Sequence, residues 1–116
     1  MLTPLEVIKR YPAHDHSLCG AYESRLAAAS ERPFFVYQGK TWGRAEFRDA
    51  YLALARVLVA RGIRKGDRVG IMLPNCPQYI VAYFAILKIG GIVVNVNPMY
   101  GERELEFQLA DAGVRA

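Results

Sequence analysis

The side chains most able to do chemistry lie in residues 95–100, at the end of an apolar run. Asn95 and Asn97 offer amide donors and acceptors, Pro98 prevents a strand from continuing, and Tyr100 adds a phenol. In open parallel sheets, ligands bind just outside the carboxyl ends of the strands. If the apolar run is such a strand, this loop is the predicted ligand-binding surface. The alternative is that the amides only satisfy the loop backbone.

Other chemistry-bearing patterns are missing from the sequence. The Gly90-Gly91 pair is not a GxGxxG fingerprint, and there is neither a GxxxxGK[ST] phosphate loop nor a Ser, His and Asp set for a nucleophile relay. Glu102, Glu104 and Glu106 alternate along an expected helix, so they point in different directions and indicate a solvated face. The sequence therefore predicts no catalytic residue and no metal site.

Composition and charge favour an ordinary intracellular domain. The 116 residues include 15 Lys and Arg against 11 Asp and Glu, spread along the chain rather than gathered, so nucleic-acid binding is not expected. Cys19 and Cys76 lie far apart, and His14 and His16 have no partners at zinc-ligand spacing. The N-terminus lacks the pattern of a signal peptide. We expect a cytoplasmic protein. A peripheral position at the inner face of the membrane is also compatible with the sequence.

Residues 79–96 approach the ~20 apolar residues that a membrane span requires. Lys88 lies near the centre of this stretch, where a charge costs roughly 2.5 to 3.5 kcal/mol, and Gly90-Gly91 follows it as a break. The stretch therefore predicts a helix, a turn and a strand, and no transmembrane segment.

The first half of the chain predicts a helix, a hairpin and a second helix. The first helix ends before Pro33, and its apolar face consists of Leu18, Tyr22, Leu26 and Ala29. Strands at 34–37 and 40–42 are expected about a Gln-Gly turn. Thr41 is the expected cap of the next helix, which Gly62 ends. The apolar stripe of that helix consists of Phe47, Tyr51, Leu54 and Leu58.

The second half predicts an α/β fold built on a βαβ unit. Apolar strands are expected at 68–73 and 92–96, joined by a helix with Asn75 as its cap and Pro77 in its first turn. Such strands pair in parallel with a right-handed crossover. A further helix ends at Gly113. A third parallel strand is due after it, so the chain is expected to be the incomplete N-terminal part of a larger domain.

Several short motifs, taken together, resemble the N-terminal part of the AMP-forming acyl-CoA synthetases, which belong to the adenylate-forming superfamily. The chain is most similar to the bacterial long-chain fatty-acid-CoA ligases, over residues 34–116. The motifs are Thr41-Trp42, KGDRV at 65–69, LPN at 73–75, AYFAILKIGG at 82–91 and VNVNPMY with REL at 94–105. Their order and spacing carry the resemblance.

The resemblance implies a two-step reaction. Enzymes of this family use ATP and Mg²⁺ to join a fatty acid or another carboxylate to AMP, and the thiol of coenzyme A then displaces AMP. The family's phosphate-binding loop, nucleotide contacts, acyl pocket and catalytic lysine lie beyond the residues matched here. The 116 residues are therefore expected to be structural and inactive on their own, with no cofactor bound.

The loop after the second strand is the one place where the resemblance implies a site. In acetyl-CoA synthetases, the residues after the equivalent strand approach the channel of the coenzyme A thiol, and they fall on residues 97–100 here. Those relatives carry Phe-Gly-Gly-Phe, so this sequence keeps only the final aromatic residue. Asn97 and Tyr100 are the candidate cofactor-binding residues. Gly101 also departs, because long-chain ligases usually hold a Thr there as a helix cap.

We expect residues 1–33 to form a helical lead-in and residues 34–116 to begin the large AMP-binding domain. Two alternatives are also consistent with the sequence. A non-catalytic interaction module, dimeric through an exposed sheet edge, would have the same composition. An adenylating enzyme that loads a carrier protein instead of coenzyme A shares the same N-terminal pattern.

Overall fold

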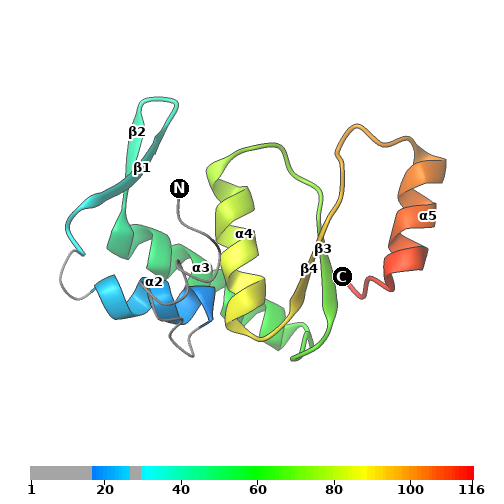
Figure 1. The fold of residues 1–116 in the computed structure, drawn as a ribbon, viewed down its shortest axis with the longest axis horizontal. Coiled ribbons are helices and arrows are strands. Elements are labelled where there is room, and N and C mark those ends of the chain that lie inside the picture. The colour runs from blue at the N-terminus through cyan, green and yellow to red at the C-terminus, as the bar shows by residue number, and fades with distance from the viewer. Residues whose placement is uncertain (1–16, 27–29) are drawn as a thin grey trace, which may run out of the picture.

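The structure, a computed structural model, describes residues 17–26 and 30–116. The predicted positions of His14, His16 and Ala29 lie outside these residues. Figure 1 shows the hairpin and α5 at opposite ends of the molecule, with α3, α4 and a small sheet between them. In chain order the elements are α2 (Leu18–Leu26), β1 (Pro33–Tyr37), β2 (Lys40–Gly43), α3 (Arg44–Ala60), β3 (Arg68–Ile71), α4 (Pro77–Lys88), β4 (Ile92–Asn95) and α5 (Glu102–Ala112).

The predicted hairpin is confirmed. Strands β1 and β2 pair antiparallel, and the turn between them places Gln38 at φ 47° and Gly39 at φ 80°. Positive φ at both central residues is what a tight two-residue hairpin requires. The ring of Phe35 stacks on Trp42 with centroids 5.6 Å apart, which holds the two strands together on one face.

The predicted cap of α3 is wrong by two residues. Thr41 pairs with Val36 inside the hairpin, and the ladder continues to Gly43, which becomes the N-cap. The backbone N–H of Gly43 donates to Glu46 Oε1 at 3.4 Å. Thr41 cannot cap the helix because strand pairing already holds its backbone. The C-terminal end is as predicted, since α3 ends at Ala60 and Gly62 follows at φ 89°.

The predicted βαβ unit is confirmed. Strands β3 and β4 pair in parallel, with Arg68 opposite Ile92 and Ile71 opposite Asn95, and α4 joins them. Both strands are shorter than predicted, although the N–H of Val96 still donates to the Ile71 carbonyl at 2.9 Å.

The cap of α4 is also displaced from the predicted residue. Pro77 takes the first helical position, so its neighbour Cys76, and not Asn75, is the N-cap, with extended backbone at φ −145° and ψ 165°. The residue before a proline is biased toward this extended conformation, which places it outside the helix.

Helix α4 is buried on two sides, as its uniformly apolar sequence predicts. One side contributes Phe84 and Ala85 to a core with Phe47 and Tyr51 of α3. The other side contributes Ile86 to a second core beneath the sheet. No helix in the described ranges is long and apolar enough to span a membrane.

The single charge of α4, at its C-terminal end, is paired at the surface with a carboxylate of α2. Lys88 Nζ lies 2.7 Å from Glu23 Oε2 of α2, and the hydroxyl of the fully buried Tyr51 donates to Glu23 Oε1 at 2.7 Å. Burial acts to raise the pKa of Glu23, but the hydrogen bonds from Lys88 and Tyr51, with the charge of Lys88, outweigh it and lower the pKa. This stabilisation is present above the unfolded-state pKa of the carboxyl and is lost as pH falls through the folded value.

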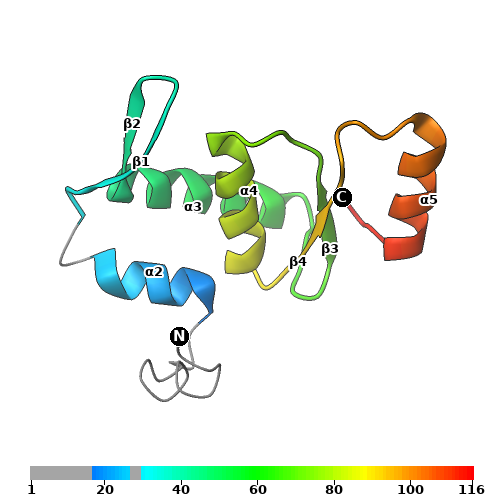
Figure 2. The same cartoon turned by 45° about the horizontal axis from the view of Figure 1, so that its top comes forward.

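The chain after α5 returns to the sheet. Gly113 ends the helix in the left-handed conformation at φ 64°, as predicted. The N–H of Arg115 then donates to the Arg68 carbonyl at 2.8 Å, and the N–H of Gly70 donates to the Ala116 carbonyl at 2.7 Å. Figure 2 shows this segment running beside β3. The residues expected to begin a third strand therefore hydrogen-bond to β3, although the sheet in the described residues consists of β3 and β4 alone.

We expect Tyr51→Phe to destabilise the fold by about 1–2 kcal/mol, because a buried hydroxyl that donates to a carboxylate is lost. The control is Tyr37→Phe, whose hydroxyl is exposed and only accepts from Gln38 at 3.4 Å. It should change stability by less than about 0.5 kcal/mol. Urea denaturation measures both, and equal midpoints for wild type and Tyr51→Phe would contradict the role of this contact.

We expect Gly91→Ala to destabilise the fold by about 1–3 kcal/mol through overpacking. A Cβ at Gly91 would lie 2.9 Å from Ile86 Cγ2 and 3.1 Å from the Ile86 carbonyl oxygen. The matched control is Gly43→Ala, where an added Cβ meets nothing within 4 Å. Its effect should stay below about 1 kcal/mol. Thermal unfolding compares the two, and a larger loss in Gly43→Ala would refute the packing argument.

Candidate functional site

The two loops that follow β3 and β4 leave the sheet at the same edge, since the strands are parallel. In Figure 1 both loops rise at the top of the molecule, one toward α4 and the other toward α5. The second of these, residues 96–101, is the loop predicted from the sequence. It lies where parallel sheets bind their ligands.

Asn97 uses its side chain within the loop. Its Oδ1 accepts a hydrogen bond from the N–H of Met99 at 2.9 Å, and its carbonyl accepts one from the N–H of Tyr100 at 3.1 Å. This is the local turn that Asn side chains commonly form. The amide oxygen of Asn97 therefore holds the loop in shape.

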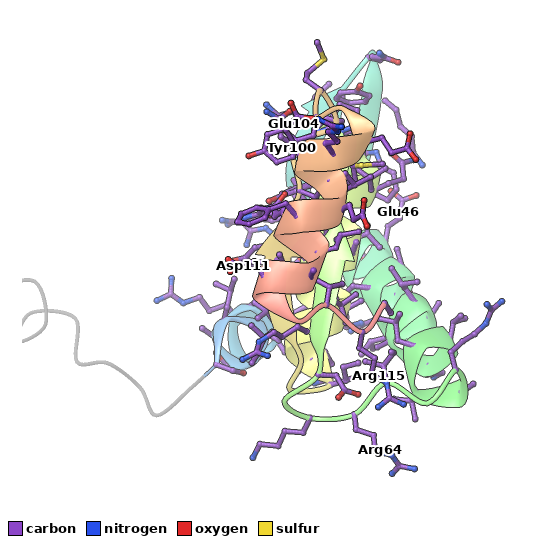
Figure 3. All side chains as sticks on the ribbon, turned by 90° about the vertical axis from the view of Figure 1, so that its right-hand side faces the viewer. Glu46, Arg64, Tyr100, Glu104, Asp111 and Arg115 are labelled. Atoms are coloured by element: carbon purple, nitrogen blue, oxygen red, sulfur yellow. The ribbon has the colours of Figure 1, made fainter. Side chains whose placement is uncertain are left out.

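Tyr100 lies against α5. This residue, 43% exposed, lines a depression of about 510 Å³ along α5. Figure 3 shows Tyr100 and Glu104 near the first turn of α5 and Asp111 near its last turn. The remaining lining residues are Arg103, Phe107 and Gln108. Asn97 is not among them, so the two predicted residues share a loop but not a pocket.

Two residues that the sequence did not single out, Tyr79 and Gln108, tie this loop to its surroundings. The hydroxyl of Tyr79, in the first turn of α4, donates to Asn95 Oδ1 at the end of β4. The side-chain amide of Gln108, on α5, donates to the Asn95 carbonyl at 2.8 Å. Tyr79 sits in an apolar helix and Gln108 in a polar one, so neither carries a signal in the sequence.

Among the described residues, the loops at the carboxyl ends of β3 and β4 offer hydrogen-bonding groups and aromatic surface but no reactive centre. The perturbed pKa values belong to groups away from this end of the sheet: burial raises the pKa of Cys19, Tyr22 and Tyr51. The pKa of Glu23 is lowered, because the hydrogen bonds from Lys88 and Tyr51 outweigh its burial. Over residues 17–26 and 30–116, no cluster of His, Cys, Asp and Glu has the geometry to hold a metal ion. The described residues are suited to positioning a ligand and form no acid/base or nucleophilic pair that the geometry reveals.

Comparison with known proteins establishes the family. The sequence profile of the AMP-binding enzymes matches residues 22–116. A chain with this match, a parallel βαβ unit and a polar loop at its carboxyl edge belongs to the AMP-binding enzyme family.

The curated relatives include long-chain-fatty-acid-CoA ligases. That of Bacillus subtilis is 38% identical over 111 residues, which cover 96% of this chain and 20% of the relative. That of an Escherichia coli O6:H1 strain is 41% identical over 119 residues, which cover 94% of this chain and 21% of the relative. The chain thus spans about a fifth of the length of these relatives.

Solved structures of two kinds of adenylate-forming enzyme share the fold. O-succinylbenzoate coenzyme A synthetase from Bacillus subtilis, in complex with AMP, matches with a TM-score of 0.76 and 31% identity, covering 80% of this chain and 24% of that one. The fused adenylation-PCP di-domain NpsA-ThdA from Klebsiella oxytoca matches with a TM-score of 0.83 and 26% identity, covering 90% and 20%. The expected α/β class and the N-terminal position within a larger domain are confirmed.

Proposed function

We propose that this chain is the N-terminal segment of an ATP-dependent fatty-acid-CoA ligase. In the first step the carboxylate oxygen of the acid attacks the α-phosphate of ATP, giving acyl-adenylate and pyrophosphate. In the second step the thiol of coenzyme A attacks the acyl carbon, and AMP leaves with the electron pair of the broken C–O bond. The observation that carries the proposal is the identity of about 40% with long-chain ligases over nearly all of the chain.

Within such an enzyme, residues 1–33 are the helical lead-in and residues 34–116 begin the large AMP-binding domain. The role that the structure supports is to build the first strands of the sheet and to present their carboxyl edge. ATP, Mg²⁺ and the acyl chain are assigned to the rest of the enzyme, because this edge lacks a phosphate-binding loop and a cluster of metal ligands in the described residues. The proposed location is the cytoplasm, where ATP and coenzyme A are supplied, including the inner face of the membrane.

Tyr100 is the proposed contact of this segment with coenzyme A, through the part of the cofactor that carries the thiol. The partly exposed phenol ring provides an amphipathic surface for such an arm. Asn97 is proposed to contribute indirectly, by positioning Tyr100. Its amide oxygen and its carbonyl hold the turn that leads to Tyr100.

Loading of a carrier protein is the second candidate. It is favoured by the likeness to the adenylation-PCP di-domain from Klebsiella oxytoca. Both acceptors would present a thiol to the same acyl-adenylate. Incubation of the full-length enzyme with a fatty acid, ATP and either coenzyme A or a thiol-bearing carrier protein separates the two functions by the product formed.

Tyr100→Ala in the full-length enzyme is expected to slow thioester formation on the order of tenfold while leaving adenylate formation unchanged, because only the second step uses the thiol. Pyrophosphate exchange measures the first step and thioester formation the second. Tyr100→Phe, which keeps the ring, should retain most of the activity. An equal loss of both steps in Tyr100→Ala would instead mean that the residue is needed for folding.

The 116 residues alone are expected to bind no ATP, in contrast to the full-length enzyme. Calorimetric titration measures this binding, with circular dichroism of the same sample showing that the helices have formed. Coenzyme A is titrated in parallel. Tight ATP binding by the segment would refute the assignment of the nucleotide site to the rest of the enzyme.

A further inference from the structure

The end of strand β4 is held from two sides. Asn95 is its last residue, and the candidate loop begins directly after it. Tyr79 of α4 donates to its side chain, and Gln108 of α5 donates to its carbonyl. The backbone amide of the next residue, Val96, donates to the Ile71 carbonyl at 2.9 Å, and the Val96 side chain is buried. The start of the loop is thus fixed by three neighbouring elements, α4, α5 and β3.

The beginning of the loop and the turn at Asn97 form one continuous set of contacts. Asn97 follows the buried Val96 and orders Met99 and Tyr100 through its side chain and carbonyl. The N–H of Leu105 then donates to the Gly101 carbonyl at 3.0 Å as α5 begins. A change in the conformation of Asn95 would therefore change the position of Tyr100, because a short, hydrogen-bonded segment connects the two residues.

Tyr79 also links the two carboxyl-edge loops. It stands in the first turn of α4, directly after the loop that leaves β3, and its hydroxyl reaches the residue where β4 ends. Its ring packs against the core beneath the sheet and lies 6.2 Å from the ring of Tyr83. Because the ring is held by packing, the hydroxyl is placed at a fixed point, as the support of a binding site requires.

We propose that Tyr79 and Gln108 are positioning residues that set the conformation of residues 96–101, and through it the rate at which the acyl group reaches the acceptor thiol. This inference rests on the proposed function for its effect on the reaction. Neither side chain is proposed to touch the substrate. Each acts through Asn95, so the two should matter for the second step and not for adenylate formation.

The test uses the full-length enzyme with Tyr79→Phe, which removes only the hydroxyl. Its matched control is Tyr83→Phe, one turn later on α4, whose hydroxyl makes no hydrogen bond with the described residues. We expect Tyr79→Phe to slow thioester formation roughly three- to tenfold, the effect of one hydrogen bond. Pyrophosphate exchange should remain as in wild type, and Tyr83→Phe should leave both steps unchanged. Equal slowing of both steps, or no slowing of the second, would overturn the proposal.

A structural readout keeps this test separate from the proposed function. Amide hydrogen exchange over residues 96–101 should be faster in Tyr79→Phe and in Gln108→Ala than in wild type and Tyr83→Phe. If the wild-type enzyme forms no thioester, the proposed function fails, while unequal exchange still supports the network. Exchange at the wild-type rate in both variants would show that Asn95 is held without them.

Discussion

The fold depends on the burial of α4 between two layers. Parallel strands cannot be joined by a tight turn, so the chain between β3 and β4 must cross over the sheet and return. Helix α4 makes this crossover with apolar residues on both sides, Phe84 and Ala85 toward α3 and Ile86 toward the sheet. A helix with one polar face would leave one of these two layers without a partner. The pairing of β3 with β4 follows from this packing.

The same packing places the candidate site. Because α4 begins at the carboxyl ends of the strands, its first turn lies beside the last residue of β4. The hydroxyl of Tyr79 in that turn therefore donates a hydrogen bond to Asn95 Oδ1. At the C-terminal end of α4, Lys88 forms an ion pair with Glu23 of α2. Helix α4 thus connects α2, the sheet and the loop of residues 96–101.

Much of the fold could be predicted from local patterns. The Gln38-Gly39 turn, the apolar stripe beginning at Phe47 and the break at Gly90-Gly91 all depend on neighbours in the sequence, and the structure contains each of them. The helix caps were less predictable. Thr41 and Asn75 are good capping residues, but strand pairing holds the first and Pro77 moves the helix start away from the second. Local preference gives way where a long-range ladder or a fixed backbone angle competes with it.

The candidate site divides in the same way. Its location follows from the sequence, because an apolar strand that ends in Asn, Asn and Pro can be recognised as emerging from a sheet. The division of labour among its residues does not. That Asn97 turns inward to Met99, that Tyr100 faces α5, and that Tyr79 and Gln108 meet at Asn95 are decided only by the tertiary structure. The sequence determines which residues are apolar and where the backbone can turn, whereas contacts between residues 13 and 16 positions apart exist only once the helices have packed.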